Sequence, residues 1–159
     1  YILIISLIVY RFMFFKIEAE EMNPSYWINT GAVAITTLAG ANILLKGTAP
    51  FLSDLSPFIK GFTLFFWAAG TWWIPYLFIV GAWRHFYKHY PLTYHPVYWG
   101  LVFPMGMYTV ATYRLAEVLS MDFLLLIPQY FIYLALIAWA ITFYGLISRL
   151  FTAFRRSLA

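Results

Sequence analysis

The residues with the clearest chemical consequence lie in one apolar stretch, from His95 to Glu117. Pro104 sits near its middle, with Gly100 and Gly106 on either side. A proline inside a helix removes one backbone hydrogen bond and clashes with the carbonyl four residues earlier, here that of Gly100. In lipid, a freed carbonyl is tolerated only where protein or a water-filled cavity satisfies it. The stretch is therefore predicted to be a bent helix that lines a pathway, with Phe103 at the bend.

Five side chains of this stretch share one helical face. They are Phe103, Met107, Val110, Arg114 and Glu117. If that face lines a pathway, Phe103 is a plug near the middle of the bilayer and Arg114 is an electropositive group toward the outer mouth, about 16 Å further along. The alternative is that Phe103 packs in a helix core while Arg114 and Glu117 form a local pair at the interface. From the residues alone, both interpretations stay open.

A second polar stripe lies earlier in the chain. Asn29, Thr36 and Gly40 fall on one helical face at spacings of seven and four. The stripe is either a polar pore lining or a set of inter-helix contacts, which in bilayers contribute well under about 2 kcal/mol each. We keep both interpretations.

Three histidines, His85, His89 and His95, cluster between two apolar stretches. The spacing of His85 and His89 suits a metal, so a membrane-anchored redox or metal subunit is one alternative function. Three histidines are few for such an enzyme, and structural roles at the interface are favoured. The chain has no cysteine, and no nucleophilic triad, carboxylate pair or phosphate loop stands out. We therefore predict no enzyme activity, no metal and no cofactor.

The elements that must position these residues follow from composition. Of 159 residues, 64% are hydrophobic and 10% charged, whereas soluble domains are about half apolar and about a quarter charged. This predicts an all-α, multi-pass membrane protein. Five segments approach the roughly 20 residues of a bilayer crossing: residues 1–15, 24–45, 57–83, 96–118 and 123–147. The first residue, Tyr1, opens an apolar run, so we expect a span already under way and a beginning that is absent.

Basic residues predict the orientation of these spans. Seven fall on one side: Arg11, Lys16, Arg84, Lys88, Arg149, Arg155 and Arg156. Lys46 and Lys60 fall on the other side, and Arg114 leans toward them. The excess of Lys and Arg marks the cytoplasmic side, so we predict a cytoplasmic C-terminus.

The chain also contains a repeat of 72 positions. The motif P-x-Y-W occurs at Pro24–Trp27 and again at Pro96–Trp99, each time at the start of a span. Gly31 then occupies the position that matches Phe103. Each copy is a helical hairpin whose first helix is rich in small residues and prolines and whose second helix is bulky. Because small residues let helices approach closely, we predict that the first helices are inner and the second helices outer.

Two stretches carry a resemblance to a known family: MNPSYWINTGAVAITTLAGANIL and YWGLVFPMGMYTVATY. They resemble the tellurite-resistance/C4-dicarboxylate transporter family, which includes the plant slow anion channels and fungal malate and sulfite carriers. The second stretch is similar to the family's Trp-x-x-x-Phe-Pro signature in its ninth span. The resemblance covers essentially the whole chain but only the last five of the family's ten spans.

The resemblance implies helical hairpins around a central pore, inner helices bent at proline, and a phenylalanine gate at Phe103. It implies a channel or transporter for small inorganic or organic anions, such as malate, sulfite, chloride or nitrate, in a homotrimer of the bacterial inner membrane. A proton-coupled carrier of C4-dicarboxylates or sulfite is the alternative within transport. Half of the pore wall lies outside this sequence, so we expect the stretch alone not to enclose a pathway. The expected partners are anions and the lipid bilayer, and no nucleic acid is expected.

Overall fold

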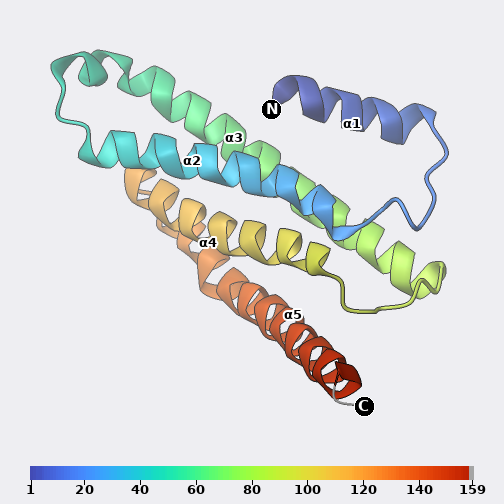
Figure 1. Cartoon of the computed structure of the whole chain (residues 1–159). Helices are drawn as coiled ribbons and strands as arrows, with labels where there is room; N and C mark the ends of the chain where they lie inside the picture. The colour runs from blue at the N-terminus through green and yellow to red at the C-terminus, as the bar shows by residue number, and fades with distance from the viewer. Residues whose placement is uncertain (158–159) are drawn as a thin grey trace.

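Residues 1–157 fold into five long helices joined by turns and loops (Figure 1). The computed structural model describes residues 1–157, and no strand occurs among them. The predicted tail residue Arg156 has a side chain outside the part that is described. The helices are α1 (Ile2–Phe14), α2 (Ile28–Lys46), α3 (Pro50–Ala82), α4 (Trp99–Leu119) and α5 (Leu126–Ser157). The predicted all-α fold is confirmed.

Helices α2 and α4 lie side by side at the centre of the fold (Figure 1). Helix α3 packs on α2, and α5 packs on α4. The first helix of each predicted hairpin is thus central and the second flanks it. Aromatic rings contribute to the packing of α1 on α3: Phe12 lies 6.2 Å from Trp73 and 5.5 Å from Tyr76, centroid to centroid.

Small residues allow α2 and α3 to pack closely. A Cβ atom added to Gly40 would lie 2.0 Å from Oγ1 of Thr63, and one added to Gly70 would lie 2.8 Å from Cγ2 of Val33. Both distances are shorter than any normal contact, so the two helices approach this closely only because glycine stands at these positions.

The two P-x-Y-W motifs begin their helices in the same way. Each forms a 3-10 turn, Pro24–Trp27 before α2 and Pro96–Tyr98 before α4, with proline at the first position. The preceding side chain caps each turn: Oδ1 of Asn23 accepts from the Ser25 backbone N–H at 2.9 Å, and Nδ1 of His95 accepts from that of Val97 at 3.3 Å. Proline lacks an N–H that would be unsatisfied here, so it suits the first turn.

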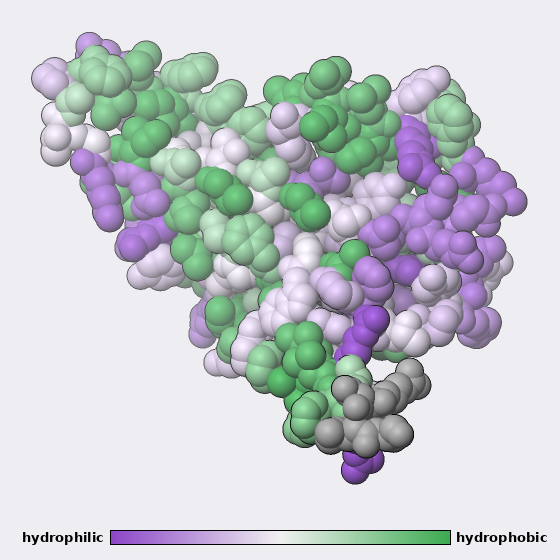
Figure 2. All heavy atoms as spheres, in the orientation of Figure 1, coloured by the Kyte–Doolittle hydropathy of each residue, from purple (hydrophilic) through white to green (hydrophobic). Residues whose placement is uncertain are grey.

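Three segments are long and apolar enough to cross a membrane: Pro24–Lys46, Pro50–Tyr87 and Asp122–Arg155. Helices α3 and α5 extend beyond the predicted spans 57–83 and 123–147, because a helix longer than the apolar layer can continue into the polar region. Hydrophilic residues gather mainly at the end that holds the loops before α2 and α4, with a smaller group opposite (Figure 2). The prediction of a membrane protein is confirmed.

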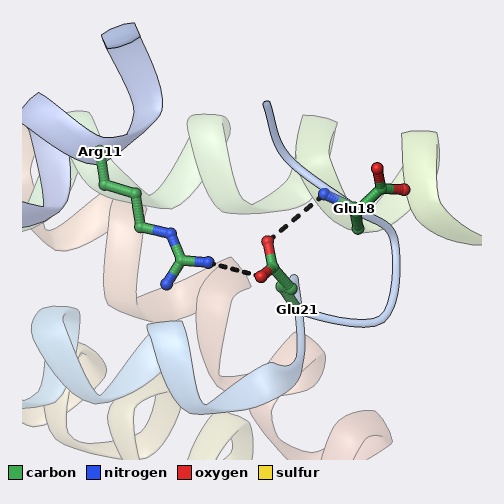
Figure 3. A network of polar contacts seen from close by, with 3 residues as sticks. All are labelled: Arg11, Glu18 and Glu21. Carbon is green, nitrogen blue, oxygen red and sulfur yellow. Dashed lines mark hydrogen bonds and ion pairs between the residues drawn. The ribbon is translucent and has the colours of Figure 1, made fainter. Parts of the chain in front are cut away.

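An ionic network holds the loop between α1 and α2 (Figure 3). Nη2 of Arg11 lies 2.8 Å from Oε1 of Glu21, whose other oxygen accepts from the Glu18 backbone N–H at 3.4 Å. Lys16 pairs with the Glu18 side chain at 2.9 Å. The hydrogen bond and charge of Lys16 lower the pKa of the Glu18 carboxyl. Because these contacts are exposed, we expect them to order the loop and to add little to the free energy of unfolding.

Candidate functional site: the open face of α2 and α4

Helix α4 has a buried face and an open one. The core covers eight of its residues: Pro104, Met105, Tyr108, Thr109, Ala111, Thr112, Leu115 and Ala116. On the opposite side Phe103 is 55% exposed and Val110 is 47% exposed, and Met107, Arg114 and Glu117 are half-buried or exposed on the same side. The five residues of the predicted stripe therefore share one face, and that face points away from the core.

The proline of the predicted bend is fully buried, where it contacts α2. A Cβ atom on Gly31 would lie 3.1 Å from Cγ of Pro104. One turn earlier, a Cβ atom on Gly100 would lie 3.7 Å from the Ile28 side chain. Phe103 is about 100° around the helix from Pro104, so the contact that buries Pro104 leaves Phe103 facing outward. The repeat pairs Gly31 with Phe103, whereas in space Gly31 contacts the neighbouring proline.

The predicted stripe on α2 lies at one edge of its exposed side. Asn29, Thr36 and Gly40 are all half-buried. Oγ1 of Thr36 donates to the Ala32 carbonyl at 3.0 Å within α2, and Gly40 packs against α3. The exposed side itself includes four apolar residues that lie alongside this stripe, Ile28, Ala32, Ile35 and Ala39. These four residues and the five-residue stripe of α4 are called the open face below.

The open face is mostly apolar, with space around its centre. Apart from the adjacent residues and backbone of α4 itself, no atom lies within 4 Å of a Cβ atom added to Gly106, which is next to Met107. The face carries charge only toward the end of α4, where Nη1 of Arg114 lies 2.8 Å from Oε2 of Glu117. The predicted electropositive mouth residue is thus paired within its own helix, so its field is partly neutralised.

Two hydrogen bonds hold the buried face of α4 against α3. Nε1 of Trp67 donates to Oγ1 of Thr112 at 2.9 Å, and the hydroxyls of Thr71 and Tyr108 are 2.7 Å apart. Sequence reasoning missed both, because the partners are separated by 45 and 37 positions and polar residues scattered among aromatic ones give no pairing signal. In an apolar layer such bonds fix the rotation of α4, and with it the direction of Phe103.

The three histidines do not converge. Nδ1 of His85 donates to the Tyr90 carbonyl at 2.9 Å, His95 caps the turn before α4, and His89 adopts a left-handed backbone with φ of 51°. Within the described chain, no three His, Cys, Asp or Glu side chains are grouped as metal ligands. The redox-subunit alternative therefore finds no ligand set in this part of the molecule.

One residue near the site was misjudged from the sequence. The predicted span ends at residue 83, so the sequence placed Arg84 just outside it, among the basic residues of the predicted cytoplasmic side. The structure leaves it only 6% exposed, in a π-helical turn (Trp83–Tyr87) at the end of α3. An arginine in this context carries no sequence signal that separates a buried position from an interfacial one.

Comparison with known proteins gives the family. Residues 1–147 match the family described as voltage-dependent anion channel. A protein of Mycobacterium tuberculosis strain H37Rv, named as an uncharacterized membrane protein, is 36% identical over 157 residues, which cover 99% of this chain and 80% of that protein.

An uncharacterized transporter of Methanocaldococcus jannaschii is 24% identical over 152 residues, which cover 96% of this chain but 43% of the transporter. No solved structure matches the chain. The resemblance of the two P-x-Y-W stretches pointed to anion channels and transporters, and the match over residues 1–147 confirms it. The chain belongs to the voltage-dependent anion channel family.

Proposed function

We propose that the open face of α2 and α4 is part of the wall of a pore for small anions, and that Phe103 is its gate. The observation that carries the proposal is the contrast between two neighbours. Pro104 is fully buried against α2, while Phe103, in the second turn of α4, is 55% exposed. A bulky ring held outward by its own helix is suited to block a narrow passage.

The chemistry of the open face supports weak rather than tight anion binding. Its one acidic residue, Glu117, is paired with Arg114, so little negative charge repels an anion. No deep cationic site lies on the face either, and conduction requires sites that an ion can leave. We propose dicarboxylate, sulfite, chloride or nitrate as the substrate class. Passive passage is favoured over proton coupling, because the middle of the open face carries no titratable carboxylate.

Further helices complete the proposed pore, and further subunits complete the assembly. The open face of these helices needs further helices opposite it before a pathway is enclosed. The chain spans less than half of the Methanocaldococcus transporter, and we propose that the corresponding helices complete the pore. We also propose a homotrimer in the bacterial inner membrane, as the family resemblance implies.

The test of the gate is Phe103→Ala in the full-length protein, recorded under voltage clamp. We expect the anion current to rise about tenfold, the effect of a barrier lowered by about 1.4 kcal/mol. The matched control is Phe65→Ala, since Phe65 lies on α3 and is 56% exposed. It should leave the current unchanged. An unchanged current in Phe103→Ala, with expression confirmed, would sink the gate assignment. Flux with and without a pH gradient tests the proton-coupled alternative.

A further inference from the structure

Arg84 is a buried cation without an acidic partner. Its Nη1 donates to the Met22 carbonyl at 2.9 Å, and its guanidinium carbon lies 4.2 Å from the centroid of the Tyr90 ring. None of the ion pairs in residues 1–157 includes it. Burying a charge is costly unless it is paired and its hydrogen bonds are made. One carbonyl and one ring are little compensation for a residue that is 6% exposed.

The buried side chain of Arg84 lines two cavities and has an unused donor. Its Nε is enclosed and has no hydrogen-bond partner among the described residues. Arg84 lines two cavities of about 230 Å³ each, and Asn23, Pro24 and Tyr98 line both as well. Because they share these lining residues, the two cavities adjoin each other beside Arg84. A single water needs only about 10–15 Å³ by the same measure, so each cavity has room for a small hydrated ion.

The polar groups around the first cavity are suited to donate. Oδ1 of Asn23 is engaged by the backbone and hydroxyl of Ser25, which leaves the amide NH2 as a donor. Tyr98 contributes a hydroxyl. No acidic residue lines this cavity, whereas Glu20 lines the second one. A cation and neutral donors without a carboxylate favour an anion, and they favour it in the first cavity.

The position of this cavity relates it to the pore helices. Its wall includes Trp27 at the start of α2 and Leu101 in the first turn of α4. We propose that a small inorganic anion, of the nitrate or chloride class, binds in this cavity against the side chain of Arg84, at the predicted cytoplasmic end of α2 and α4. That the bound anion is also the transported one rests on the proposed function. The binding of an anion in this cavity does not depend on it.

The test uses the complete chain in lipid nanodiscs, with sodium gluconate replaced stepwise by sodium nitrate at constant ionic strength. A ligand that binds only the folded state raises the melting temperature with its concentration. We expect a saturable rise in the wild type. Arg84→Met, which keeps the stem and removes the charge, should weaken the apparent affinity for nitrate by at least about tenfold. The control Arg149→Met removes an exposed arginine and should respond as the wild type does.

A second variant decides the question if Arg84→Met does not fold. Asn23→Asp keeps the capping oxygen and places a carboxylate beside Arg84, so it supplies the missing partner. We expect it to melt higher than the wild type without nitrate and to lose the response to nitrate. The inference is overturned if the wild type shows no saturable rise, or if Asn23→Asp binds nitrate as tightly as the wild type. If nitrate binds to the wild type but Phe103→Ala leaves the current unchanged, the gate assignment is wrong and the anion site at Arg84 still stands.

Discussion

Single atoms decide how closely the helices pack. The ring of Pro104 lies against Gly31, and the hydroxyl of Thr63 lies where a Cβ atom on Gly40 would be. In contrast, apart from the adjacent residues and backbone of α4 itself, nothing lies within 4 Å of a Cβ atom on Gly106. Glycines that look equivalent in the sequence therefore have different roles: two permit helix contact, and one leaves space on the open face.

Because their surroundings differ, replacing Gly40 or Gly106 by alanine should have opposite effects on stability. Gly40→Ala should destabilise the fold by about 1–3 kcal/mol, the usual cost of overpacking, because its new methyl group would lie 2.0 Å from Oγ1 of Thr63. Gly106→Ala should be neutral or slightly stabilising, since alanine is the better helix former. Melting temperatures in detergent measure both.

Shortening the Thr63 side chain tests whether its hydroxyl causes the loss of stability in Gly40→Ala. In Gly40→Ala with Thr63→Ala, the hydroxyl is gone and the Thr63 Cβ position, 3.1 Å away, becomes the closest contact. We expect the double variant to recover part of the lost stability. Equal melting temperatures for Gly40→Ala and Gly106→Ala would show that the helices adjust freely, contrary to this account.

At the scale of elements, the sequence predicts which residues share a face better than what each face contacts. The stripe from Phe103 to Glu117 follows from a period of 3.6, which local geometry determines, and the structure places it on one side. The buried position of Arg84 and the bond between Trp67 and Thr112 depend on helices distant in sequence. No local pattern encodes such contacts, so they could not be predicted.

The role of the open face is testable by cysteine labelling, because the chain has no native cysteine. Val110→Cys lies on the open face of α4, and Ile141→Cys lies on α5, where Ile141 is 63% exposed. A thiol reacts as its thiolate, which forms in water and not in lipid. We expect a charged thiosulfonate to label Val110→Cys at least about tenfold faster than Ile141→Cys. Equally slow labelling of both in the full-length protein would place the open face in lipid.

If Phe103 is the gate, the rate at which Val110→Cys is labelled should depend on the side from which the reagent is added. Val110 lies beyond Phe103 when counted from the predicted cytoplasmic end of α4. Reagent added from the cytoplasmic side should therefore reach Val110→Cys faster when Phe103 is alanine. Labelling from the outer side should change less, since Phe103 does not lie on that route.

At the scale of the molecule, charge still favours one orientation after one correction. Arg84 is buried, so it is not counted. The end that holds the loops before α2 and α4 keeps six basic residues: Arg11, Lys16, Lys88, Arg149, Arg155 and Arg156. The opposite end has Lys46, Lys60 and Arg114. Acidic partners affect orientation little, so the predicted cytoplasmic side remains the end with the larger basic group.

The orientation can be measured by replacing either of two exposed threonines with cysteine, one at each end of the helices. Thr48 lies in the loop between α2 and α3, and Thr93 lies in the loop before α4. The 19 residues of α2 separate these ends by about 28 Å, close to the thickness of the apolar layer. In intact cells an impermeant maleimide should label Thr48→Cys at once and Thr93→Cys only after the membrane is opened. Because both side chains are exposed and the substitution is identical, a reversed pattern would mean that the basic end faces outward, and the Arg84 cavity would then open to the outside.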